Sequence, residues 1–185
     1  MTIYRAFLMM AMVCLTACAG GPAKSDLIYY DLGAATEVLP TPLRGLDVVP
    51  SSWLASNAMY YRLVYVDGNR REHFANTRWT AQPAELLGVR LHQSLIANAE
   101  KTALTCRMRI ELDDFVQVFD SAASSQLLLE GRATLYGAQQ LVLARKSLRV
   151  QVPAGANAQS AVAASSGMTT AVARELHEWV RQVCK

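Results

Sequence analysis

The amino-acid sequence predicts an α+β domain in which a mainly antiparallel sheet is covered by two helices, forming a two-layer sandwich. Three observations indicate this class. Apolar and polar side chains alternate within residues 104–152, leucine recurs at every fourth position within residues 81–101, and residues 157–183 are amphipathic. With four strand-like runs before residue 81, the expected element order is β-β-β-β-α-β-β-β-α.

Length and composition favour a single domain over residues 27–185. The chain has 185 residues, of which 52% are hydrophobic and 18% are charged, so it can bury a sizeable core. The formal net charge is only +3, and the basic residues are scattered along the chain. Because nucleic-acid binding needs a concentrated basic surface, no nucleic-acid partner is expected.

Residues 1–17 have the parts of a lipoprotein signal peptide. A positive charge at Arg5 precedes an apolar run, and small residues stand directly before Cys18. The run is too short for a membrane span, which needs about 20 apolar residues. Leu15 to Cys18, with the sequence LTAC, resembles a bacterial lipobox, whereas Cys14 has no leucine three positions before it. Lipidation is therefore expected at Cys18, and a simple apolar leader is the alternative.

Residues 18–26 would then be a lipidated flexible tether, because Gly20, Gly21 and Pro22 lie within it. Resemblance to processed bacterial lipoproteins implies three acyl chains on Cys18, which anchor far more firmly than one. Ala19 stands where an inner-membrane retention aspartate would stand in enterobacterial-type sorting. The expected location is the periplasmic face of the outer membrane, with the lipid anchor as the contact to the membrane.

Cys106 and Cys184 would be the remaining thiols of the processed chain, and an oxidising periplasm favours a disulfide between them. Two unpaired buried thiols are the alternative, because spacing along the chain does not bring two Cα atoms within bridging distance. No metal site is expected, since the cysteines form no C-x-x-C pair and the three histidines lie far apart in sequence. No cofactor is expected beyond the covalent lipid.

Four strands are predicted in the first part of the domain. Tyr29–Leu32 and Leu46–Pro50 are short β-rich runs, joined by a proline-containing connection over residues 34–44. Residues 59–79 are predicted to form a β-hairpin whose turn is Asp67-Gly68, because β-rich runs lie on both sides of that pair.

A helix is predicted over residues 81–101. Pro83 suits its first turn and Glu85 complements the positive end of the helix dipole. One face carries an apolar stripe made of Leu87, Leu91, Leu95 and Ala99. We expect this stripe to pack on the sheet.

The rest of the chain is predicted to be a three-stranded antiparallel meander followed by a closing helix. Residues 104–119 alternate except at Asp113-Asp114, where the break indicates a β-bulge or a solvated bend. The runs over residues 126–135 and 141–152 are separated by a turn at Gly137. Residues 157–183 would cover the sheet with an amphipathic helix.

No catalytic residue is predicted. Asp113 and Asp114 are adjacent, so in a strand they point to opposite faces and cannot act as an acid–base pair. The sequence contains no G-x-S-x-G, G-x-G-x-x-G or G-x-x-x-x-G-K-[ST] motif. The tyrosines and tryptophans leave two interpretations open, namely an apolar surface for lipid or a partner strand, and ordinary core and sheet positions.

Several short stretches together resemble one known family. They are YYDL, which contains Tyr30, then LDVVPSSWL, TRWTAQPAELL, and HEWV near the C-terminus. Together with the lipobox-like N-terminus, these stretches resemble the ABC-type transport auxiliary lipoproteins, the family of PqiC-like intermembrane transport lipoproteins. The resemblance extends from Tyr29 to Trp179. The most specific stretch is Arg78-Trp79 followed by Pro83 and the leucine helix.

The resemblance implies a non-enzymatic auxiliary component of an MCE-linked lipid transport system. Its expected partner is an MCE-domain protein, and homo-oligomer formation stays open. The resemblance carries over no catalytic residue, and it implies a structural role for Tyr30, Arg78, Trp79 and Pro83, with Trp79 packed against the leucine helix. The alternative function is a lipid-binding or outer-membrane assembly chaperone lipoprotein; a periplasmic hydrolase has no nucleophile constellation behind it.

Overall fold

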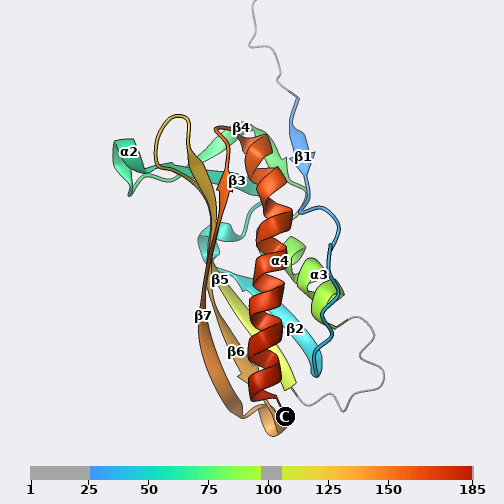
Figure 1. Ribbon diagram of the computed structural model, residues 1–185. Coiled ribbons are helices and arrows are strands. Elements are labelled where there is room, and N and C mark those ends of the chain that lie inside the picture. The colour runs from blue at the N-terminus through green and yellow to red at the C-terminus, as the bar shows by residue number, and fades with distance from the viewer. Residues whose placement is uncertain (1–25, 97–105, 185) are drawn as a thin grey trace, which may run out of the picture.

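The computed structural model describes residues 26–96 and 106–184, which form one sheet with two long helices on one of its faces (Figure 1). The strands are β1 (Ile28–Tyr30), β2 (Leu43–Pro50), β3 (Ala58–Leu63), β4 (Glu72–Trp79), β5 (Cys106–Phe119), β6 (Ser125–Tyr136) and β7 (Val142–Ala154). The helices are η2 (Ser52–Leu54), α2 (Val64–Asp67), α3 (Pro83–Leu95), η4 (Ala138–Gln140) and α4 (Ala158–Val183). The predicted two-layer α+β class and the order of the long elements are confirmed.

Some predicted features lie outside the described residues. They are the signal peptide over residues 1–17, the lipidated Cys18, nearly all of the tether over residues 18–26, and the last part of the helix predicted to end at residue 101. Within the described part of the chain, no helix combines the length and the hydropathy of a membrane span.

The sheet is mixed, with its longest ladders antiparallel. Its order is β1-β4-β3-β5-β6-β7, and β2 pairs with β5 beside that path. The antiparallel ladders β5–β6 and β6–β7 confirm the predicted meander, and the antiparallel ladder β3–β4 confirms the pairing of the two hairpin arms. The ladders β1–β4, β2–β5 and β3–β5 are parallel. β2 and β3 share one edge of β5, because β2 pairs along residues 106–112 and β3 along residues 116–119.

The predicted two-residue turn of the hairpin is wrong. β3 ends at Leu63, and the chain then forms the single helical turn α2 before β4 begins. Leu63 pairs with Phe119, the last residue of β5, so no neighbouring strand is left for β3 to extend along. Gly68 has a φ of −65°, whereas a tight type I′ turn needs positive φ at its central residues.

The interruption predicted in the long strand is a β-bulge. β5 runs continuously over 14 residues, and its register with β6 shifts between Leu112 and Asp114. The solvated bend given as the other interpretation is wrong for Asp114, whose exposed fraction is only 5%. Asp114 is therefore buried beneath neighbouring side chains rather than exposed to water.

The core lies between the sheet and the two long helices. α3 packs on β2, and α4 packs on β6 and β7 (Figure 1). As predicted, the leucine stripe of α3 is buried, and α4 buries Met168, Val172, Leu176 and Val180. Asn157 caps α4, because its side-chain oxygen accepts a hydrogen bond from the Ser160 backbone N–H at 2.9 Å. The Ser160 hydroxyl oxygen in turn accepts a hydrogen bond from the Asn157 backbone N–H, which completes a capping box.

Candidate functional site

Two of the stretches that carry the family resemblance, YYDL and TRWTAQPAELL, meet where β1 joins the sheet. In the parallel ladder of β1 and β4, Tyr29 pairs with Arg78 and Tyr30 pairs with Trp79. The backbone N–H of Thr80 donates to the carbonyl oxygen of Tyr30 at 2.8 Å, which extends this pairing past the end of β4. Residues separated by about 50 positions in sequence are thus direct neighbours.

Trp79, Arg78 and Pro83 hold the connection between β4 and α3. Trp79 is 2% exposed, and its ring centroid lies 5.5 Å from that of Phe115; it belongs to the same core as the leucines of α3. The Arg78 guanidinium donates to backbone carbonyls of its own strand, including that of Thr77 at 2.7 Å. Pro83 is buried in the first turn of α3. These contacts are structural.

A shallow hollow lies beside the same junction. It has a volume of about 420 Å³ between β1 and the first part of α4, and Tyr30 lines it. The other lining residues include Tyr29, Leu32, Val162 and Ser166. Tyr29 is 53% exposed at this edge of the sheet, so an aromatic ring faces solvent next to an apolar wall.

At the opposite end of the domain, the structure joins Cys106 to Cys184 in a disulfide. Their Cα atoms lie 6.2 Å apart, within the usual range for a disulfide. The bond connects the first residue of β5 to the residue that follows α4, across 78 positions of sequence. It therefore ties the C-terminal helix to the centre of the sheet.

The face of the sheet that points away from α3 and α4 is charged; we call it the open face. Its charged side chains alternate with buried ones along the central strands. They are Asp47 on β2, Arg107, Arg109 and Glu111 on β5, Glu130 and Arg132 on β6, and Arg145 and Arg149 on β7. Ion pairs such as Arg132–Asp113 at 3.1 Å cross between strands. Exposed pairs of this kind contribute little to stability.

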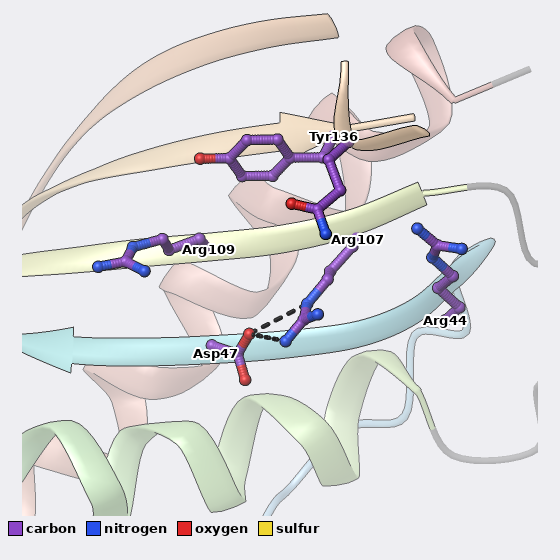
Figure 2. A pocket seen from close by; sticks show the side chains of 6 residues that line it. Arg44, Asp47, Arg107, Arg109 and Tyr136 are labelled. Carbon is purple, nitrogen blue, oxygen red and sulfur yellow. Dashed lines mark hydrogen bonds and ion pairs between the residues drawn. The ribbon is translucent and has the colours of Figure 1, made fainter. Parts of the chain in front are cut away.

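One hollow on the open face, which we call the arginine hollow, has a volume of about 220 Å³. Figure 2 shows it between β2, β5 and the end of β6. It is lined by Arg44, Asp47, Arg107, Arg109, Tyr136 and Gln140. Three guanidinium groups and one carboxylate give these six residues a formal charge of +2.

The three arginines of the hollow differ in how they are paired. Arg107 donates twice to the Oδ2 atom of Asp47, at 3.1 Å from Nε and 2.6 Å from Nη2 (Figure 2). Arg109 lies 3.8 Å from a Glu111 carboxylate oxygen, beyond hydrogen-bonding distance. Among the described residues, Arg44 has no ion-pair partner. Arg107 is thus held by Asp47, whereas Arg109 has only a looser ion pair with Glu111.

A second charged cluster lies further along the open face, at the bulge. The Oδ2 atom of Asp114 accepts hydrogen bonds from Arg62 at 2.8 Å and from Arg71 at 3.0 Å. The Arg71 guanidinium also lies over two rings, 5.6 Å from the centroid of Tyr60 and 5.9 Å from that of Trp53. The carboxylate thus holds the chain around α2 against β5.

On the other side of β3, Tyr61 packs between two phenylalanines. Its ring centroid lies 4.7 Å from that of Phe74 and 6.0 Å from that of Phe119. Its hydroxyl donates to Glu72 at 2.7 Å, and this hydrogen bond, together with burial, raises the pKa of the Tyr61 phenol above its ordinary value of 10.0. Tyr61 therefore stays a neutral hydrogen-bond donor at neutral pH.

The arginine hollow was not predicted as a site from the sequence. The alternation in β5 does place Arg107 and Arg109 on one face, but Arg44 joins them only through the parallel pairing of β2 with β5. Within the described ranges, no group of three or more His, Cys, Asp or Glu side chains could hold a metal ion.

Comparison with known proteins connects the fold to solved structures. No family model matches the sequence, and no curated protein matches it. The crystal structure of protein XCC0632 from Xanthomonas campestris, of family DUF330, matches with a TM-score of 0.63 and 14% identity, over 83% of this chain and 91% of that one. The crystal structure of an uncharacterized protein matches with a TM-score of 0.64 and 12% identity, over 84% of this chain and 99% of that one. The domain therefore has the fold of a DUF330 protein.

Proposed function

We propose that this chain is an outer-membrane-anchored periplasmic lipoprotein that serves as a non-enzymatic docking component of an MCE-linked intermembrane lipid transport system. The observation that carries the proposal is the lipobox-like sequence ending at Cys18, placed directly before a domain with the DUF330 fold. The family resemblance over Tyr29 to Trp179 supports the transport role.

The open face supports docking rather than catalysis. Its side chains are mainly arginines and carboxylates in cross-strand pairs, an arrangement suited to recognition of a charged surface. The arginine hollow contains donors for an anion, but no pair of groups arranged as a nucleophile and its base. The hollow would hold a partner in place without changing it chemically.

The anchoring part of the proposal is tested by Cys18→Ala, with Cys14→Ala as the matched control. We expect Cys18→Ala to move the protein from the membrane fraction to the soluble fraction, because the acyl chains supply the membrane affinity. Cys14→Ala should leave it in the membrane fraction. Intact-mass spectrometry should show acyl chains on the wild-type protein and on Cys14→Ala, but none on Cys18→Ala. An unlipidated wild-type chain would contradict the proposal.

The docking part is tested by chemical crosslinking in cells followed by mass spectrometry. We expect the wild-type lipoprotein to be captured with an MCE-domain protein, and the Cys18→Ala chain to be captured much less. Failure to capture an MCE-domain protein, or full transport function with the soluble chain, would count against this role.

The alternative function, a lipid-binding or assembly chaperone lipoprotein, is favoured by a different observation. The hollow beside β1 has apolar walls from Leu32 and Val162 and lies at the end where the tether enters the domain. Native mass spectrometry distinguishes the two functions, because a lipid chaperone would carry non-covalent lipid through purification whereas a docking component would not.

A further inference from the structure

We propose that the arginine hollow is the docking site for an acidic segment of the partner protein, whose carboxylates bind Arg44 and Arg109. The existence of a protein partner rests on the proposed function. The chemistry of the site rests on the geometry of the hollow itself.

The pairing within the hollow makes it a receptor for carboxylates. Asp47 accepts two hydrogen bonds from Arg107 and holds that guanidinium in place. Arg44 makes no ion pair within the described residues, and Arg109 makes only the 3.8 Å ion pair with Glu111, so both guanidinium groups keep N–H donors available. A guanidinium binds a carboxylate through two parallel hydrogen bonds. The lining residues carry a net charge of +2, and the balance stays positive, at +1, when Glu111 beside Arg109 is included, so the hollow attracts an acidic segment and repels a basic one.

The surroundings of the hollow indicate a protein as the occupant. The turn that supplies Gln140 continues into three exposed aliphatic residues: Leu141 at 65%, Val142 at 46% and Leu143 at 47%. Protein interfaces are enriched in arginine and tyrosine, and contiguous exposed apolar side chains mark interaction surfaces. A free phosphate or carboxylate ion would use the arginines but not these aliphatic side chains.

The position of the hollow favours a partner that approaches from the periplasm. Arg107 is next to the disulfide at Cys106, and the end of α4 lies at the opposite end of the domain from β1 (Figure 1). β1 is connected to β5 through β4 and β3, and β3 pairs with β5 from Val116 onward. Val116 lies about 30 Å along the strand from Arg107, at roughly 3.3 Å per residue. A lipid anchor ahead of β1 would therefore hold the other end of the domain near the membrane.

The first experiment places a photocrosslinking amino acid in the full-length lipoprotein in cells, as Tyr136→p-benzoylphenylalanine. The matched control is Tyr65→p-benzoylphenylalanine, since Tyr65 is 49% exposed in α2, far from the hollow. We expect Tyr136 to crosslink to an acidic stretch of the MCE-domain protein and Tyr65 not to do so. An adduct with phospholipid at Tyr136 would overturn the proposal in favour of a headgroup site.

The second experiment measures affinity with a defined probe. Full-length lipoprotein in detergent is titrated with a fluorescent peptide of alternating glutamate and leucine, and anisotropy is recorded. We expect R44Q/R109Q to weaken binding by about tenfold or more, because two charge-assisted contacts are lost. The control R145Q/R149Q removes the same charge from β7, outside the hollow, and should change binding by less than about twofold.

The outcomes separate this inference from the proposed function. Equal loss of peptide binding in both double variants, or tighter binding to phosphatidylglycerol vesicles than to the peptide, would overturn the hollow as a protein site. If cells expressing R44Q/R109Q still capture the MCE-domain protein as well as wild type, the docking function stands and the hollow is excluded as its site. If arginine-dependent peptide binding is found without an MCE partner, the site stands and the function fails.

Discussion

Asp114 is a buried carboxylate in β5 that holds neighbouring segments of the chain together. Its exposed fraction is 5%, and its Oδ2 atom is shared by Arg62 and Arg71. The other oxygen accepts the backbone N–H of Phe115 at 2.9 Å. A buried carboxylate is tolerated only when it is paired and hydrogen-bonded, and here it has three donors.

We therefore expect Asp114→Asn to lower the free energy of unfolding by about 2–3 kcal/mol, because two partly buried guanidinium groups lose their carboxylate. Urea denaturation of the purified protein measures the change. The adjacent Asp113→Asn is the matched control, since Asp113 pairs with Arg132 at the surface and should cost less than about 1 kcal/mol. Equal effects of the two substitutions would contradict the structural role of Asp114.

The sequence shows that the alternation breaks at these two aspartates, but not which of them is buried. That choice depends on β3, which brings Arg62 alongside the end of β5 through a parallel ladder. Likewise, the arginines of the hollow are visible in the sequence only as scattered charges. Their grouping comes from contacts between residues that are about 60 positions apart.

At the level of single elements, the β-bulge in β5 depends on Gly131 in β6. Gly131 pairs with Leu112 at the register shift, and a Cβ atom built on it would lie 2.6 Å from the carbonyl oxygen of Glu111. This carbonyl oxygen belongs to the backbone of β5, so it can move away from an added Cβ atom only if β5 and β6 separate. A glycine in this strand is thus required by the close approach of a second backbone.

Gly131→Ala is accordingly expected to destabilise the protein by about 2–3 kcal/mol, through overpacking against the backbone of β5. Gly88→Ala in α3 provides the contrast, because its added methyl group would contact Val48 at an ordinary 3.6 Å. There, the higher helix propensity of alanine should stabilise the protein by up to about 1 kcal/mol. Thermal and urea unfolding of both variants test this pair, and effects of the same sign would contradict the model of the bulge.

The elements that the sequence predicts well are those with long, regular patterns. The leucines of α3, the apolar stripe of α4 and the alternating apolar residues of β5 and β6 face the core as expected, whereas β7 buries only Leu148. The hairpin turn was predicted wrongly because Asp67-Gly68 is only a local signal. β3 ends where β5 ends, and that limit is set by a strand more than 40 positions away.

At the scale of the whole molecule, the disulfide between Cys106 and Cys184 closes a covalent loop across 78 positions of sequence. In the chain-entropy model, a loop of 78 residues stabilises the folded state by about 4–5 kcal/mol, by restricting the unfolded chain. The bond also holds the end of α4 beside the arginine hollow, because Cys106 directly precedes Arg107.

We expect the double variant Cys106→Ala/Cys184→Ala to lose about 4 kcal/mol or more of unfolding free energy, measured by urea denaturation of periplasm-expressed protein. Dithiothreitol should lower the stability of wild type toward that of the double variant and leave the double variant unchanged. Wild-type protein that contains two free thiols by non-reducing mass spectrometry would contradict this expectation.

The sequence was sufficient for the properties that depend on local pattern: the α+β class, the order of the elements, the faces of the long helices and strands, and the expectation of lipidation at Cys18. Each of these follows from side chains close together in the chain, where periodicity and short motifs act. The tertiary structure alone decided the parallel pairings of β1, β2 and β3, the burial of Asp114 and the formation of the arginine hollow. These features arise between segments far apart in sequence, and their geometry is set by packing and strand register, which no local pattern encodes.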